Sequence, residues 1–144
     1  MKQQDHICPE CGCIISADIF SADKMRQRFF AIVKDVHRNL AGDLLTRFPN
    51  SEYLRKYALI AVGWCTVHTI VGMSEKTAAA TTAAILFQNP YCIITFNEGV
   101  MTIYSAKSMS RRALLKKQFL DVSEKALEWI EQQTGIDGRL SEAA

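Results

Sequence analysis

A chain of 144 residues is long enough for one domain with a hydrophobic core, alone or with a small appendage. Apolar residues make up 49% of it and charged residues 22%, which is typical of a soluble globular protein. No apolar run approaches the roughly 18 residues that a membrane span needs, and the N-terminus MKQQDHICPE lacks an apolar signal core. We therefore expect a cytoplasmic protein that does not act at a membrane.

The net charge of +2 is unevenly distributed along the chain. Residues 1–117 contain 15 Lys and Arg against 9 Asp and Glu, whereas residues 118–144 contain 2 against 6. The densest positive segment is KSMSRRALLKK, from Lys107 to Lys117, which has five cationic side chains and no acid. Such a segment needs an anionic partner or full solvation, and phosphate suits its mixture of Lys, Arg and Ser.

Residues 1–13 form a Cys-rich N-terminal appendage without hydrophobic periodicity. Five cysteines, an odd number, without an export signal argue against a disulfide framework. Cys8 and Cys11 have the C-x-x-C spacing of a zinc half-site, and Cys13 and His6 offer further ligands. No second C-x-x-C follows at zinc-ribbon spacing, so structural zinc, incidental thiols and redox chemistry all stay open. No cofactor is required, and a second subunit could complete the zinc site.

An amphipathic helix follows a short predicted strand over residues 14–20. The helix is expected to begin at Ser21, a plausible N-cap, and to end near Gly42. Its apolar face carries Met25, Phe29, Ile32, Val33, Val36 and Leu40, and its other face carries Lys24, Arg26, Arg28, Lys34 and Arg38.

The central part of the chain alternates helix and strand signals. A second helix is expected over residues 51–62, a β-branched strand over 64–71, and an Ala/Thr-rich helix over 75–87 that Ser74 caps. Strands over residues 91–96 and 100–104 flank Asn97-Glu98-Gly99, which has the composition of a hairpin turn.

A final amphipathic helix is expected to end at Gly135, before a flexible tail over residues 136–144. The predicted order of elements indicates a single α+β domain over residues 14–135. In it, three or four helices pack on a small, largely antiparallel sheet.

No constellation of side chains indicates catalysis. The sequence has no Ser/His/Asp grouping, P-loop or GxGxxG motif. A magnesium-dependent nuclease needs paired carboxylates near a strand lysine. Glu98 and Lys107 are the nearest approach, but the acid-x-Lys pattern is missing. We therefore expect a protein that is not an enzyme.

The basic elements predict a nucleic-acid interface. Lys and Arg that follow a phosphate chain, interleaved with aromatic rings on which bases stack, hold single strands without reading their sequence. Arg55 and Lys56 on the second helix could join this surface, although a solvated charged face is the alternative. The predicted binding residues are Lys107, Ser110, Arg111, Arg112, Lys116, Lys117, Arg26 and Arg28.

A second hypothesis is a protein-binding module that occupies or inhibits a host factor. The acidic side of the last helix would then be its contact face. Its carboxylates are Asp121, Glu124, Glu128 and Glu131.

The basic helix KMRQRFFAIVKDV, the second helix SEYLRKYALIAVGW and the segment SAKSMSRRALLKKQFLDV give the chain a recognisable order. This order resembles the lambda NinB (Orf)-type phage recombination mediators and related small phage recombination-region proteins. The resemblance spans about Ser21 to Gly135, and its closest piece is Ser108-Met109-Ser110-Arg111 with Phe119 beyond it.

The resemblance implies a homodimer that binds single-stranded DNA and a host single-strand-binding protein. Such proteins help to load a recombinase and carry out no chemistry themselves. The implied DNA contacts are Ser110 and Arg111, with Arg28 as a looser match. The Cys-rich N-terminus departs from the family pattern, which puts the implied oligomer and partner in doubt.

Overall fold

The computed structural model describes residues 6–7, 14–15, 17–110 and 115–138, with side chains from residue 23 onward. Its elements, in chain order, are β1 (His6–Ile7), β2 (Ile14–Ile15), α1 (Ala17–Arg38), α2 (Asp43–Arg47), α3 (Ser51–Ala61), β3 (Cys65–Ile70), α4 (Glu75–Gln88), β4 (Ile93–Asn97), β5 (Val100–Ala106) and α5 (Lys116–Thr134). This is a small α+β domain, as the sequence predicts.

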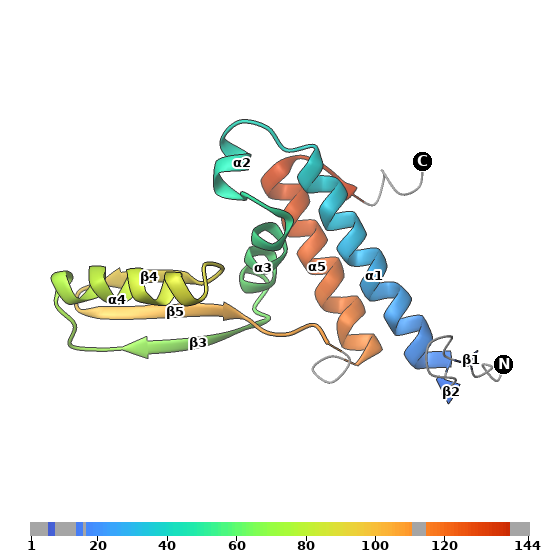
Figure 1. Cartoon of the computed structure of the whole chain (residues 1–144), viewed down its shortest axis with the longest axis horizontal. Helices are drawn as coiled ribbons and strands as arrows, with labels where there is room; N and C mark the ends of the chain where they lie inside the picture. The colour runs from blue at the N-terminus through green and yellow to red at the C-terminus, as the bar shows by residue number, and fades with distance from the viewer. Residues whose placement is uncertain (1–5, 8–13, 16, 111–114, 139–144) are drawn as a thin grey trace.

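Figure 1 shows that the elements from α1 onward form two parts. The helical body consists of α1, α2, α3 and α5. The wing consists of β3, α4, β4 and β5, and it projects to one side of the body. The body contains most of the hydrophobic core, because α1, α3 and α5 each bury one apolar face against the others. Phe29 of α1 meets Phe119 of α5 edge to face, with ring centroids 6.0 Å apart.

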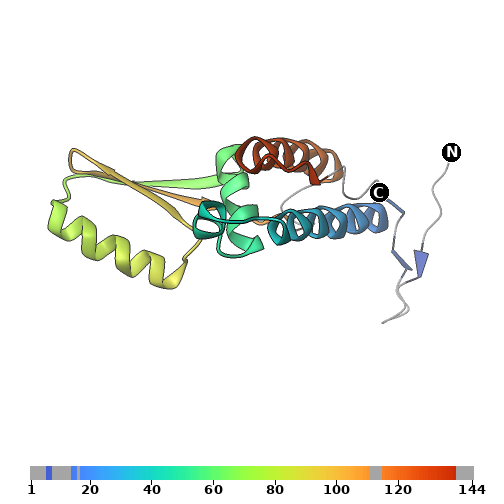
Figure 2. The same ribbon diagram turned by 90° about the horizontal axis from the view of Figure 1, so that it is seen from above.

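The wing is a three-stranded antiparallel sheet with one covered face. The strand order is β3-β5-β4, so β3 and β4 are the edges. The helix α4 lies on one side of this sheet (Figure 2). Met101 and Cys92 are buried beneath it, with 0% and 5% of their surfaces exposed.

Local signals in the sequence explain where several of these elements begin and end. The Ser74 hydroxyl accepts a hydrogen bond from the Thr77 N–H and so caps α4. Glu98 and Gly99 both have positive φ, 50° and 78°, which is the conformation of a type I′ hairpin turn between β4 and β5. Gly135 takes the left-handed conformation, with φ of 74°, directly after α5. The predicted hairpin and the predicted end of the last helix are therefore confirmed.

The helix α1 begins earlier than the sequence predicts. The predicted strand over residues 14–20 is reduced to Ile14–Ile15, which pairs with His6–Ile7, and α1 already begins at Ala17. A short apolar run does not separate strand from helix by periodicity alone. The helix also ends at Arg38, before Gly42, and the five residues of α2 follow as a further helix.

Residues beyond Gly135 pack back against α1. Gly138 is buried, and a Cβ atom built on it would lie within clash distance of Ile32 Cγ2 and 2.7 Å from Val36 Cγ2. Part of the expected tail therefore belongs to the packed structure. At Gly138 the backbone lies so close to α1 that a larger residue would overlap its side chains.

Candidate nucleic-acid interface

The first four residues of the basic run, residues 107–110, are held in place on the helical body. We call them the anchored segment. The Lys107 N–H donates to the Trp64 carbonyl at 3.1 Å, and the Trp64 indole Nε1 donates to the Ser108 carbonyl at 3.1 Å. Arg26 Nε donates to the Met109 carbonyl at 2.8 Å, and the Met109 side chain is 3% exposed in the core. The segment thus has a fixed backbone although it lies outside any helix or strand.

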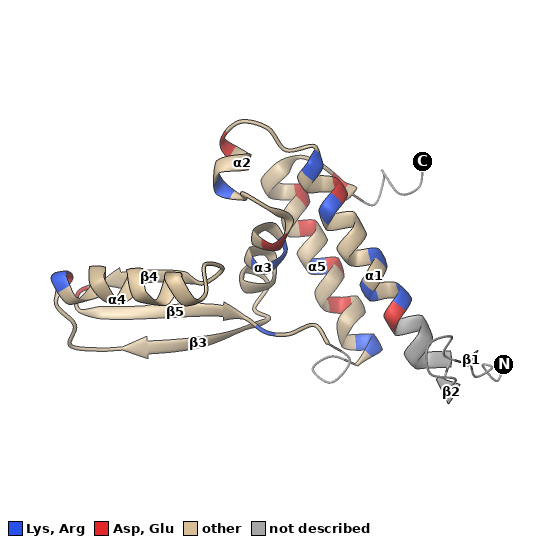
Figure 3. Ribbon diagram, viewed as in Figure 1, with Lys and Arg blue, Asp and Glu red and all other residues tan. Residues whose placement is uncertain are grey.

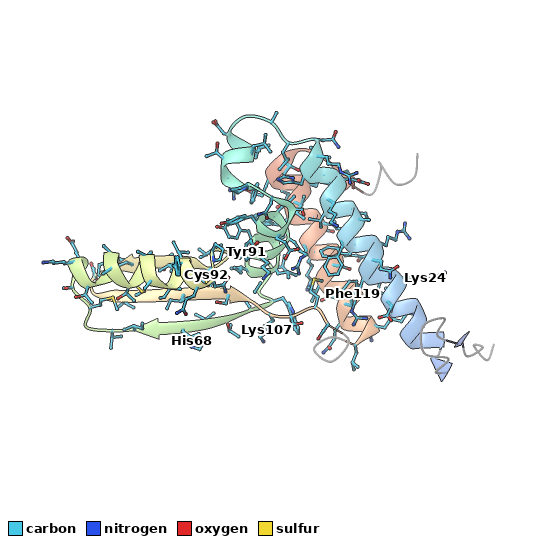
Figure 4. The ribbon with its side chains drawn as sticks, in the orientation of Figure 1. Lys24, His68, Tyr91, Cys92, Lys107 and Phe119 are labelled. Atoms are coloured by element: carbon cyan, nitrogen blue, oxygen red, sulfur yellow. The ribbon has the colours of Figure 1, made fainter. Side chains whose placement is uncertain are left out.

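An open cavity of about 500 Å³ lies beside the anchored segment, where α1, α3 and the end of β5 meet. We call it the basic cavity. Figure 4 shows Lys107 at this junction, where the chain leaves the wing toward α5. The lining residues are Arg26, Phe30, Arg55, Lys56, Ala106, Lys107, Ser108, Met109 and Ser110. Four of them are cationic, and none of the described residues that line the cavity is acidic.

The two lysines of the cavity each lie over an aromatic ring. Lys107 Nζ lies 5.1 Å from the centre of the Trp64 ring, and Lys56 Nζ lies 4.6 Å from the Tyr91 ring. A cation over a ring face is attracted by the ring quadrupole and keeps its full charge. The two lysines are therefore held at the cavity with their charge available to an anion.

Arg55 is shared between the cavity and a carboxylate just outside its lining. Its Nε and Nη2 atoms donate to the two oxygens of Glu52 at 3.0 and 2.6 Å. These hydrogen bonds lower the pKa of Glu52 below its ordinary value, against an opposing effect of burial. The Arg55 guanidinium also lies over the Phe30 ring, 5.0 Å from its centre. Glu52 thus orients Arg55 and offsets part of its charge.

The predicted binding residues of the basic run fall into three groups by their place in the structure. Lys107 and Ser110 are exposed on the anchored segment, and Ser110 N–H donates to the Ser108 hydroxyl at 3.1 Å. Lys116 and Lys117 form the first turn of α5, where no acid is present. Arg111 and Arg112 lie between these two groups in the chain, outside the described residues.

Arg26, one of the predicted binding residues, is buried and does not present its charge at the surface. Only 8% of its surface is exposed, because its guanidinium lies over the Phe119 ring at 5.1 Å and donates to the Met109 carbonyl. An ion pair with Asp23, 3.6 Å from Arg26 Nη1, adds to these contacts. Arg26 therefore holds the anchored segment in place from below the cavity.

Arg28 lies away from the basic cavity. It lines a smaller groove of about 180 Å³ between α1 and α5, together with apolar residues of both helices. The structure therefore brings together Arg26, Lys107 and Ser110 of the predicted set, and separates Arg28 from them.

Trp64 has a structural role that the sequence does not predict, since in the sequence it is only the first residue of the expected strand over residues 64–71. The residue lies before β3, holds the Ser108 carbonyl and carries Lys107 over its ring. The signal available in the sequence was chemical, because a partly buried indole N–H usually finds an acceptor.

The predicted metal ligands are not tested by the described residues. Cys8, Cys11 and Cys13 lie outside them, and only the backbone of His6 is described, in β1. Within the described part of the chain, no group of three or more His, Cys, Asp or Glu is placed to hold a metal ion.

Comparisons with models of protein families, with curated proteins and with solved structures found no match to this chain. Among the described residues, no helix is both long enough and apolar enough to cross a membrane.

Proposed function

We propose that the protein is a DNA-binding accessory protein that holds the backbone of single-stranded DNA at the basic cavity. The observation that carries this proposal is the anchored segment. It presents Lys107 and two serine hydroxyls from a fixed backbone, opposite Lys56 and Arg55 of α3. Cationic and hydroxyl donors that are already ordered bind phosphate oxygens without first losing side-chain and loop entropy.

The composition of the cavity supports binding without sequence specificity. Asn and Gln pair with adenine and Asp and Glu accept from cytosine, and none of these side chains is among the described residues that line the cavity. The described lining contains Lys, Arg and Ser beside aromatic rings, which suits phosphate contact and stacking. A cavity of about 500 Å³ also has the size for a nucleotide unit of a flexible strand.

The biological role follows from the resemblance to NinB (Orf)-type mediators. We propose a role in phage recombination or replication, in the cytoplasm of the host cell, without catalysis by the protein itself. A host single-strand-binding protein is the partner that this role implies. The proposal draws support from the two parts of the resemblance that the structure brings together, the basic helix α1 and the Ser-Met-Ser segment.

The proposal is tested by measuring the affinity for a fluorescent single-stranded oligonucleotide at several salt concentrations. Lys56→Ala/Lys107→Ala should weaken binding and reduce the slope of log affinity against log salt by about 1.4, or roughly 0.7 for each lost phosphate contact. Arg111→Ala/Arg112→Ala should have an effect in the same direction.

The matched control is Lys76→Ala/Lys125→Ala, which removes the same charge from exposed positions outside the cavity. We expect this variant to bind like the wild type. Equal losses in the control and in the cavity variant would show that only net charge matters, and would reject the cavity as the site.

The alternative function is a module that occupies a host factor. Its contact face would be the acidic side of α5. Asp121, Glu124 and Glu128 are exposed there, and Asp121 is paired with Lys125 at 3.1 Å. Capture of a host protein from nuclease-treated lysate, lost in Glu124→Lys/Glu128→Lys and kept in Lys56→Ala/Lys107→Ala, would favour this function.

A further inference from the structure

The basic cavity gathers its positive charge into the space of one small ligand. Its lining takes cations from three places in the fold: Arg26 of α1, Arg55 and Lys56 of α3, and Lys107 after β5 (Figure 3). A groove that follows a single strand spreads its cations over about 4–16 nucleotides. A cavity of about 500 Å³ instead has the volume of a single small-molecule site. The described lining therefore fits one strongly anionic group better than a run of phosphodiesters.

The positive charge of the cavity exceeds what one phosphodiester can offset. Lys56 and Lys107 lie over aromatic rings, which do not neutralise them. Arg55 adds part of a third charge, because Glu52 offsets the rest. A phosphodiester within a strand carries one negative charge, whereas a phosphate monoester carries about 1.5–2 at pH 7. The cavity therefore matches the charge of a monoester more closely.

The anchored segment supplies hydroxyl donors that suit the same group. Ser108 and Ser110 line the cavity beside Lys107, on a backbone that Trp64 and Arg26 hold in place. The Ser108 hydroxyl accepts from the Ser110 N–H and keeps its own hydrogen for donation. A monoester offers three strong acceptor oxygens, one more than a phosphodiester has free of the chain. Ordered donors from several sides can be satisfied together by these three oxygens.

We propose that the basic cavity binds a phosphate monoester at an end of single-stranded DNA, in preference to the phosphodiesters within the strand. The inference rests on the proposed function, because it names the part of the strand that the same site takes. It places the protein at free strand ends, which a closed circle of DNA lacks. Inorganic phosphate and a mononucleotide carry a similar anionic group, so the test includes both as competitors.

The experiment measures the affinity of the full-length protein for one oligonucleotide in several forms: 5′-phosphorylated, 3′-phosphorylated, without a terminal phosphate, and closed into a circle. We expect a phosphorylated end, 5′ or 3′, to bind about tenfold more tightly than the last two forms, which is the effect of one further hydrogen bond to a charged group. Equal affinity for all forms, weakened in each case by Lys56→Ala/Lys107→Ala, would overturn the inference and leave the proposed function standing. Absence of binding to every form would reject both.

Two variants locate the preference at the cavity. Lys56→Ala/Lys107→Ala should lose most of the preference for a phosphorylated end. Lys107→Gln, a single change at an exposed residue, should reduce it in the same direction, and circular dichroism checks that both variants fold. Lys76→Ala/Lys125→Ala, at exposed positions outside the cavity, should keep the full preference. A preference that both cavity variants retain would overturn the inference.

The dependence on pH gives a readout that belongs to the phosphate itself. The second pKa of a monoester is about 6, whereas the Lys and Arg of the described lining stay charged between about pH 5 and pH 7.5. Glu52, just outside the lining, also stays charged, because its hydrogen bonds to Arg55 lower its pKa. The preference should therefore be full at pH 7.5 and shrink at pH 5, and a preference independent of pH would contradict the monoester. Inorganic phosphate or a mononucleotide that competes as strongly as the phosphorylated oligonucleotide would overturn the strand end as the ligand.

Discussion

At the scale of single residues, the positive charge of the basic cavity depends on which groups offset the charge of each cation. Arg26 is buried and holds a carbonyl, whereas Lys56 and Lys107 lie over aromatic rings that do not neutralise their charge. Arg55 lies between these extremes because Glu52 accepts two hydrogen bonds from it. The charge of the cavity can therefore be increased at Glu52 without adding a cation.

Glu52→Gln should tighten the binding of single-stranded DNA, because Arg55 would then be available to a phosphate group. We expect the salt slope to steepen by about 0.7, the value of one additional contact on a single strand. Glu75→Gln, in the first turn of α4, is the matched control and should leave DNA affinity unchanged. An unchanged slope in Glu52→Gln would remove Arg55 from the interface.

The same pair predicts a small effect of pH on stability. The pKa of Glu52 is lowered in the folded protein by its hydrogen bonds to Arg55, so the pair stabilises the fold at pH above about 4.5. This contribution is lost as the pH falls through the lowered pKa. Since Glu52 is about half exposed, it should amount to only about 0.3–0.5 kcal/mol. Urea unfolding of wild type and Glu52→Gln at pH 7 and pH 3 measures it, and a difference that grows toward pH 3 would contradict the assignment.

At the scale of elements, the first turn of α5 carries positive charge, which the helix dipole disfavours at that end. The N-terminus of a helix carries partial positive charge and favours acids, yet Lys116 and Lys117 occupy the first turn of α5. Among the described residues, the Leu115 N–H donates to the Gln118 side chain at 3.3 Å as a capping contact. Positive charge at this end opposes helix stability and favours a bound phosphate, which agrees with the proposed function.

Lys117→Glu should therefore stabilise the protein by about 0.3–1 kcal/mol while weakening its binding to single-stranded DNA. Lys76→Glu is a close control, because Lys76 is likewise the second residue of its helix and is exposed on α4 of the wing. It should raise the free energy of unfolding by a similar amount and leave DNA affinity unchanged. Loss of DNA affinity in both variants would contradict a local role for α5.

The segment after α5 is fixed by the close approach of Gly138 to α1. Gly138→Ala should lower the free energy of unfolding by about 1–3 kcal/mol, since the new methyl group overlaps Ile32 Cγ2. Chemical denaturation measures this loss. In an Ile32→Ala background the same substitution should cost less, because the overlapping atom is gone. Additive losses in the double variant would show that the two residues do not meet.

At the scale of the whole molecule, charge and apolar surface are separated between the two parts. The helical body carries most of the charged residues, whereas charge in the wing lies at its far end (Figure 3). The two parts meet at α3, where the Tyr91 and Tyr53 rings are 4.7 Å apart and Lys56 lies over Tyr91. The cavity lies at this junction, so the position of the wing determines how Lys56 of α3 faces the anchored segment.

The sequence predicted the features that depend on local patterns. The stripe of α1, the Ser74 cap, the turn at Gly99 and the end of α5 each follow from residues within a few positions of one another. The site depends on contacts between distant residues. Arg26 and Met109 are 83 positions apart, and Trp64 and Ser108 are 44 apart, so no local pattern reveals that one residue holds the other. The charge pattern predicted a basic surface but not which of its arginines is buried.

The most direct test of the central claim is amide hydrogen exchange of the full-length protein with and without a saturating single-stranded oligonucleotide. We predict slower exchange in residues 107–110 and in the part of α3 that carries Arg55 and Lys56, with β3 and the tip of the wing unchanged. Protection confined to the wing or to the acidic side of α5, or no protection at all, would contradict the basic cavity as the DNA-binding site.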